Sequence, residues 1–309
     1  MMTKMKRRRM KTVIWILTKF HVFFLADEIL NIMMTDKSVL PNNDGRRLAG
    51  PANSLPYSVY QGKVERTQSK QRSGGRAEDA YRKIFLSTGV ITKAKGSAYI
   101  EQGATKIMVG VFGPKEVQRR SEFSATGQLT VEFKFAPFSC GGGRRLGPRG
   151  EDREAEELGL VLAEALSSTV CLNKYPKSVI EVGVTVIEAD GGVVAASLTA
   201  AGLALAEAGI HLCDLVVGVK VGLSSDNRLL VDPDKEEEDR VRDGGGELTL
   251  GYLANLEQVV CLMCEGVMTG DAVSKALVSA TNTANLVLPA VQEELVHRLK
   301  QKRNSENQK

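Results

Sequence analysis

The hydrophobic pattern of this chain becomes regular only from residue 84 onward. Short apolar runs separated by glycines predict successive β-strands at residues 84–91, 96–105 and 106–114. Residues 127–138 place apolar side chains at alternate positions, which predicts a half-buried strand that ends at Pro137.

The next segments alternate between the helical and the strand period. Residues 151–166 carry apolar side chains at helical spacing with acids on the opposite face, and Asp152 suits the positive end of that helix dipole. Residues 193–209 predict a helix of small side chains, buried in the core and stopped by Gly209. Further strands are predicted at residues 179–189, 214–225, 228–234 and 246–266.

Two segments near the C-terminus are polar or interrupted. The charged run 234–246 is interpreted as a solvated loop, and residues 271–300 as a helical tail interrupted by Pro289. The order of elements predicts an α/β (α+β) domain with mixed sheets, and the second half weakly repeats the strand–strand–helix order of the first. An internal duplication is therefore a hypothesis.

The N-terminal quarter of the chain differs from this pattern. A basic run at residues 4–11 precedes an apolar stretch that Lys19 and His21 interrupt, and residues 37–78 have the composition of a flexible basic linker. The apolar stretch is shorter than the roughly 20 residues that span a bilayer, so no membrane association is expected. We predict an atypical extension at 1–75, a folded domain at 76–300 and a polar tail at 301–309; a targeting role for the extension is the alternative.

Composition narrows the classes of function. The net charge of +4 is too small for a molecule that binds nucleic acid over its whole surface. The five cysteines are odd in number and scattered, which argues against a disulfide framework and for a reducing compartment. Cys261 and Cys264 form a CxxC without a second pair or a nearby histidine, so we interpret them as core residues on opposite faces of a strand and expect no metal site.

The segment "VIEADGGVVAAS" at 186–197 has the outline of a phosphate-binding turn. Asp190, Gly191 and Gly192 end a strand and lead into a helix, but Val193 and Val194 follow and cannot hold a phosphate. The glycines are expected to let the chain turn tightly. For Asp190, capping of the following helix and a residual catalytic role are both open.

Five segments in order resemble the ribonuclease PH family, at residues 89–116, 126–139, 152–182, 186–219 and 229–239. The resemblance covers roughly residues 76–299. Within the family, the chain is most similar to subunits of the eukaryotic exosome ring of the mRNA-transport-regulator type. It implies a duplicated β-α domain and a hetero-hexameric ring with other ribonuclease PH-like subunits. It further implies S1/KH-type cap subunits, RNA in the central channel, and a location in the nucleus, including the nucleolus, and the cytoplasm.

Active members of the family use phosphate to release nucleoside diphosphates from RNA 3′ ends, and this chain departs from their pattern. The resemblance places Thr185 where they have a carboxylate, and Val193 and Val194 where they have a threonine and an arginine. Asp190 is retained, whereas Asp152 replaces a serine at the start of the earlier helix. Each missing charged contact to a transition state costs about 2–4 kcal/mol. We therefore predict a non-catalytic subunit without a cofactor that supports 3′-to-5′ RNA processing, including rRNA processing, and RNA degradation.

Two alternatives come from other classes of function. An active phosphate-dependent 3′-to-5′ exoribonuclease would need the degenerate site to work, and a free-standing RNA-binding protein would need no ring partners. Ring assembly would use exposed strand edges, for which residues 106–112 and 130–135 are the candidates.

Arginines on a glycine-rich loop are the candidate RNA contacts: Arg144, Arg145, Arg149 and, at the helix start, Arg153. The alternative is a solvated loop whose arginines pair with neighbouring acids. A second cluster of Lys115, Arg119 and Arg120 is interpreted as a solvated face.

Overall fold

The computed structural model describes Arg72 and residues 75–117, 124–140, 152–224, 228–242 and 244–307. The predicted extension therefore lies outside the described residues except at its end, where Arg72 is buried against Glu237. No helix in the described ranges is both long enough and apolar enough to cross a membrane.

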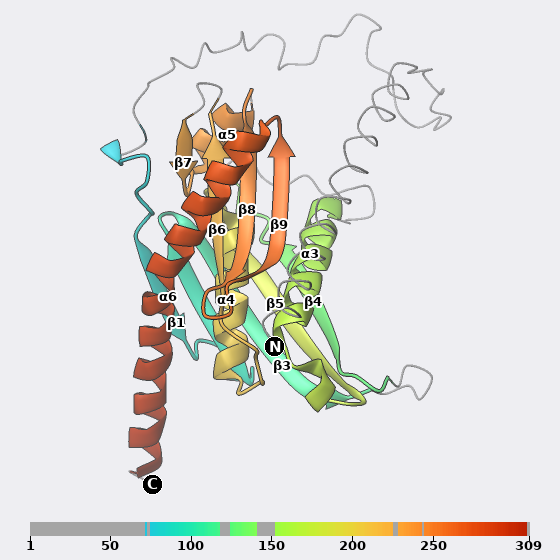
Figure 1. The fold of residues 1–309 in the computed structure, drawn as a ribbon. Helices are drawn as coiled ribbons and strands as arrows, with labels where there is room; N and C mark the ends of the chain where they lie inside the picture. The colour runs from blue at the N-terminus through green and yellow to red at the C-terminus, as the bar shows by residue number, and fades with distance from the viewer. Residues whose placement is uncertain are drawn as a thin grey trace, which may run out of the picture. The chain divides into compact units, whose positions relative to one another are not determined.

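The first half of the fold is a five-stranded sheet with two helices (Figure 1). Its strands lie in the order β1-β2-β3-β5-β4, and only β4 and β5 are parallel. The elements are β1 (Ile84–Thr88), β2 (Gly96–Gln102), β3 (Thr105–Glu116), β4 (Gln128–Phe135), α3 (Arg153–Thr169), η3 (Leu172–Lys174), β5 (Ser178–Glu188) and α4 (Val193–Glu207).

The second half repeats a sheet with helices. Its four strands are all antiparallel, in the order β7-β6-β8-β9. The elements are β6 (Val216–Leu223), β7 (Leu229–Val231), α5 (Lys235–Arg242), β8 (Gly246–Leu253), β9 (Gln258–Gly266) and α6 (Gly270–Asn307). The mixed α/β fold with two sheets confirms the predicted fold class.

A layer of helices separates the two sheets. Helix α4 packs on β2 and β3 of the first sheet and on β6 and β8 of the second, while α3 lies against β4 and β9 and α6 against β1 and β6 (Figure 1). Every residue of α4 from Ala195 to Leu205 is buried. Because both faces of this helix are covered, these residues carry uncharged and mostly small side chains all round. Its burial confirms the prediction that the helix lies in the core.

The charged run at 234–246 is not a loop, which corrects the prediction. Residues 235–242 form α5, in which Glu237 and Glu238 are buried. The prediction failed because charged side chains are buried only where they are paired, and the cations that pair with these two carboxylates come from distant segments: Arg72, Arg76 and Lys220.

Pro289 does not interrupt the C-terminal helix either. Helix α6 runs through it from Gly270 to Asn307, so residues 301–307 continue the helix. A proline inside a helix removes one hydrogen bond to the carbonyl four residues earlier. That carbonyl belongs to Asn285, which is exposed, so water can replace the lost donor.

One predicted edge strand is confirmed and the other is wrong. Strand β4, which contains residues 130–135, lies at the edge of the first sheet. Strand β3, which contains residues 106–112, is hydrogen-bonded to β2 on one side and to β5 on the other. Of these two predicted strands, β4 therefore has an unpaired side for a neighbouring strand and β3 has none.

Candidate functional site

The candidate site lies at the edge of the first sheet where the parallel strands β4 and β5 end. Parallel strands bring their carboxyl ends to the same edge, and each of these two strands is followed in the chain by a helix. Backbone hydrogen bonds from Ala136 to Val186 and from Ala189 to Ser139 continue the pairing past the strands. The turn at 189–192 and the residues that follow β4 therefore lie at the same edge of the sheet.

The two glycines of the turn are required by its geometry. Gly191 and Gly192 have φ angles of +80° and +65°, in the left-handed region. A Cβ on Gly191 would lie 2.7 Å from the carbonyl oxygen of Pro233. The structure therefore confirms the predicted structural role of these glycines.

Arg82 binds the backbone of this turn, a role that was not predicted from the sequence. Its guanidinium donates to both carboxylate oxygens of Asp232, at 2.8 and 2.7 Å, and to the carbonyls of Asp190 and Gly191, at 2.6 and 3.1 Å. Arg82 is buried, and burial opposes its charge while the hydrogen bond and the charge of Asp232 raise its pKa. Because its donors are used within the chain, Arg82 stabilises the turn and is not available to an incoming phosphate.

The N-terminus of α4 is already occupied by a carboxylate. The N-cap residue Gly192 donates its backbone N–H to Oε1 of Glu238 at 2.7 Å. The same oxygen lies 2.6 Å from Nζ of Lys220, whose charge also faces Glu247 at 2.7 Å. A backbone donor that could bind an anion at this helix start is therefore used by the protein itself.

The N-terminus of α3 also has a carboxylate at a backbone donor, supplied here by its own N-cap residue. Asp152 is its N-cap, and its side chain accepts a hydrogen bond of 3.3 Å from the N–H of Ala155. Glu154 and Glu156 add acidic side chains to the first turn, beside the exposed Arg153. This arrangement confirms that Asp152 complements the helix dipole, and it places more negative than positive side chains at the helix start.

The predicted degenerate positions occupy different surroundings. Thr185 is exposed on β5, between Met108 of β3 and Lys134 of β4. Val193 and Val194 are half-buried in the first turn of α4 and pack against the core. The apolar replacements thus extend the core up to the turn.

Asp190 does not cap the helix that follows it, which corrects one of the two interpretations. Its Oδ1 instead accepts a hydrogen bond of 3.4 Å from the backbone N–H of Lys235, at the start of α5. Its Oδ2 lies 3.8 Å from Nη1 of Arg82. Burial raises the pKa of Asp190, an effect that Lys235 and Arg82 oppose and that the nearby carboxylates of Asp234 and Glu188 reinforce.

Of the candidate RNA contacts, only Arg153 can be placed. Arg144, Arg145 and Arg149 lie outside the described residues, as do Arg119 and Arg120 of the second cluster. Lys115 forms an exposed ion pair with Glu181 at 2.6 Å, as expected for a solvated face.

Metal ligation finds no support in the part of the chain that is described. That part contains no group of three histidine, cysteine, aspartate or glutamate side chains that could hold a metal ion. Cys261 is buried in β9, where burial raises its pKa to about 11, and Cys264 is half-buried three residues further along the strand. This spacing places them on opposite faces, and the burial of Cys261 confirms its predicted place in the core.

Comparison with known sequences decides the family. Residues 80–211 match domain 1 of the 3′ exoribonuclease family, called RNase PH, and residues 214–283 match domain 2. The chain belongs to this family. The two matched regions correspond to the two sheets with their helices, which supports the duplicated architecture.

Relatives with assigned names extend the comparison. The chain is 37% identical to the exosome complex component Rrp41 of Nitrosopumilus maritimus, over 71% of this chain and 88% of that protein. It is 36% identical to the exosome complex component MTR3 of Mus musculus, over 72% and 83% of the two chains. The human MTR3 gives the same identity and coverage.

Solved structures show the same fold. Rice Rrp46 superposes with a TM-score of 0.62 at 23% identity, covering 72% of this chain and all of that one. A chain from the Archaeoglobus fulgidus exosome with RNA bound to the active site gives a TM-score of 0.59 at 25% identity, with coverages of 71% and 92%.

Proposed function

We propose that this chain is a non-catalytic ribonuclease PH-like subunit of the RNA exosome core ring. Its identity to exosome components, over most of the length of those proteins, supports membership of such an assembly. Within the ring it would contribute structure and RNA contacts to 3′-to-5′ processing and degradation. The nucleus, the nucleolus and the cytoplasm are the compartments proposed for it.

The capping of both helix N-termini at the candidate site carries the proposal that catalysis is lost. An attacking phosphate needs cationic or N–H donors in a preorganised arrangement. Here Glu238 and Asp152 occupy a donor at the start of α4 and α3, and Arg82 is bound to Asp232. Val193 and Val194 supply no replacement donors from their side chains.

The second candidate function is an active phosphate-dependent exoribonuclease. It is favoured by Asp190, whose side chain is 35% exposed and whose pKa is raised, as suits a general acid. The identity to Rrp41 and the likeness to an exosome chain from a structure with RNA in its active site point the same way. The two candidates share the ring and differ only in chemistry.

Co-purification from the native source tests the proposed assembly. A tagged full-length chain is expected to bring down other ribonuclease PH-like subunits, S1/KH-type cap proteins and RNA, and to elute from a sizing column as one large complex. A chain that elutes as a monomer and ignores these partners would contradict the proposal and favour a free-standing RNA-binding protein. A deletion of the extension should end before Arg72, because that side chain is buried against Glu237.

A further inference from the structure

Two cysteines that are far apart in sequence lie side by side at the end of α3. The Sγ atoms of Cys171 and Cys213 are 3.4 Å apart, although the residues are separated by 42 positions. Both are free thiols. The sequence pattern does not indicate this pair, because its two members belong to different segments of the chain.

The backbone fixes both cysteines in a short antiparallel pairing. Val170 and Leu212 form an isolated bridge. On either side of it, Cys171 donates its N–H to the carbonyl of His211 at 2.9 Å, and Cys213 donates to that of Thr169 at 2.8 Å. The two thiols are therefore held near each other before any reaction takes place.

A reagent in solution can reach this pair. Cys213 is exposed and Cys171 is half-buried, whereas Cys261 is buried in β9. A disulfide needs the sulfur atoms to be about 2.05 Å apart, so the two thiols would have to approach by about 1.4 Å from their separation of 3.4 Å. Side-chain rotation of an exposed cysteine can supply a movement of this size.

We propose that Cys171 and Cys213 form a reversible dithiol–disulfide pair that a peroxide oxidises. The thiolate of Cys213 attacks one oxygen of the peroxide and the O–O bond breaks. This oxygen stays on Cys213 as a sulfenic acid, and the other oxygen leaves as water or alcohol after taking up a proton. The Cys171 sulfur then displaces the hydroxyl group of the sulfenic acid as a second water, and the S–S bond forms. The two thiols lose two electrons and two protons to the peroxide. Two molecules of a small thiol such as glutathione then reduce the protein disulfide to two thiols and become one molecule of glutathione disulfide.

The environment of Cys213 sets the pH at which the reaction is fast. The hydrogen bond with Cys171, burial and the carboxylate of Asp214 raise the pKa of Cys213, while the charge of Lys174 lowers it. Because the thiolate is the reactive form, oxidation is expected to become faster as the pH rises from 7 to 9.

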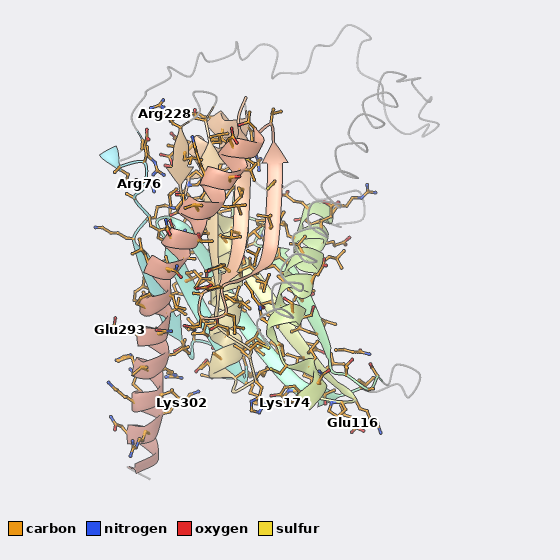
Figure 2. The ribbon with its side chains drawn as sticks, in the orientation of Figure 1. Arg76, Glu116, Lys174, Arg228, Glu293 and Lys302 are labelled. Carbon is orange, nitrogen blue, oxygen red and sulfur yellow. The ribbon has the colours of Figure 1, made fainter. Side chains whose placement is uncertain are left out.

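The disulfide would join domain 1 to the segment that connects it to domain 2, far from the candidate site. Cys171 lies in the region that matches domain 1, and Cys213 lies between that region and the one that matches domain 2. Figure 2 labels Lys174, next to this pair, at the opposite end of the fold from Arg76, which contacts α5 beside the candidate site. Oxidation is therefore expected to stabilise the junction of the domains without entering the Asp190 turn.

Mass spectrometry of the oxidised full-length protein tests the proposal. Reduced protein is treated with hydrogen peroxide, its remaining thiols are alkylated, and it is digested with trypsin without reduction. The expected product links peptide 154–174 to peptide 178–220, with a mass two hydrogens below their sum, and the link disappears after reduction. The midpoint of thermal unfolding should rise by roughly 5–10 °C in the oxidised form, because the bond closes a loop of about 40 residues.

Matched variants separate this pair from general oxidation. Cys171→Ser and Cys213→Ser should each abolish the link and the thermal shift, whereas Cys140→Ser should retain both. Full alkylation of Cys171 and Cys213 after peroxide treatment would overturn the proposal. So would disulfides distributed without preference among Cys140, Cys171 and Cys213.

Discussion

The backbone N–H of Gly192 and the carboxylate of Glu238 form a hydrogen bond of 2.7 Å at the start of α4. Lys220 balances the charge of this carboxylate from the other side, at 2.6 Å. One backbone donor of the helix end where a phosphate could have been bound is thus used by an internal ion pair that also fixes α5 to the sheet. The turn keeps its shape because Glu238, Arg82 and Asp232 hold it, and this shape does not depend on a bound anion.

Arg82 is predicted to be the most important single side chain for the stability of the turn. Arg82→Ala would leave the carboxylate of Asp232, which is fully buried, without its cationic partner. Loss of one member of a buried ion pair typically costs about 3–5 kcal/mol. Urea denaturation should show this decrease, and Lys115→Ala, in an exposed pair, should leave the unfolding midpoint unchanged. Equal effects of the two substitutions would refute a structural role for Arg82.

Gly191 and Gly209 form a matched pair of left-handed glycines with different surroundings. Their φ angles are +80° and +71°, but a Cβ on Gly191 would meet the carbonyl of Pro233, whereas a Cβ on Gly209 has no atom within 4 Å. Gly209→Ala should cost about 1 kcal/mol from backbone strain alone. Gly191→Ala should cost about 3 kcal/mol, because overpacking adds to the strain. Free energies of unfolding that rank the two substitutions in the opposite order would be inconsistent with this geometry.

Glu207 should make the docking of α6 sensitive to acid. Its carboxylate accepts hydrogen bonds from the backbone N–H groups of Gly89 and Ser97 and from Arg298 of α6, with Lys302 at 3.3 Å. Burial opposes the charge, but the hydrogen bond from Ser97 and the two cations outweigh it and lower the pKa of Glu207.

Because the folded pKa is below the ordinary value of 4.5, this stabilisation is complete above that pH. It is lost as the pH falls through the lower pKa of the folded state. Glu207→Gln should therefore reduce the free energy of unfolding by about 1–3 kcal/mol at pH 7. The difference between the two proteins should shrink below pH 4.5, and a constant difference down to pH 3 would argue against the proposed origin.

Arg153 is the described residue expected to contact RNA phosphates. Arg153→Ala should weaken RNA binding equally for different sequences and lower the slope of log affinity against log salt by about 0.7, as for one contact to a single strand. Filter binding at several salt concentrations measures this slope, with Lys115→Ala as the control. An unchanged slope would favour a solvated helix start.

Apart from α5, the order of strands and helices was predictable because it depends on local periodicity. The small residues of α4 correctly predicted a helix buried on all sides, and the alternation in β4 correctly predicted which of its faces is buried. The site was only half predictable for the same reason. The glycines and valines of the turn are neighbours in sequence, whereas Arg82, Glu238 and Lys220 reach it from three separate segments.

The wrong prediction for α5 and the undetected cysteine pair also result from contacts between segments that are distant in the sequence. Glu237 and Glu238 belong to a run that is typical of a solvated loop, and only their distant cations explain why they are buried. The pairing of Cys171 with Cys213 depends on a two-residue bridge between segments that are far apart in the chain. Long-range charge pairs and short bridges leave no periodic signal in a sequence.

Phosphorolysis by the isolated chain tests the central claim most directly. Purified full-length protein is incubated with a single-stranded RNA labelled at its 3′ end, with and without inorganic phosphate, and nucleoside diphosphate is quantified. The account predicts no phosphate-dependent release above the background of an Asp190→Ala variant. Release that requires phosphate and disappears in that variant would contradict it.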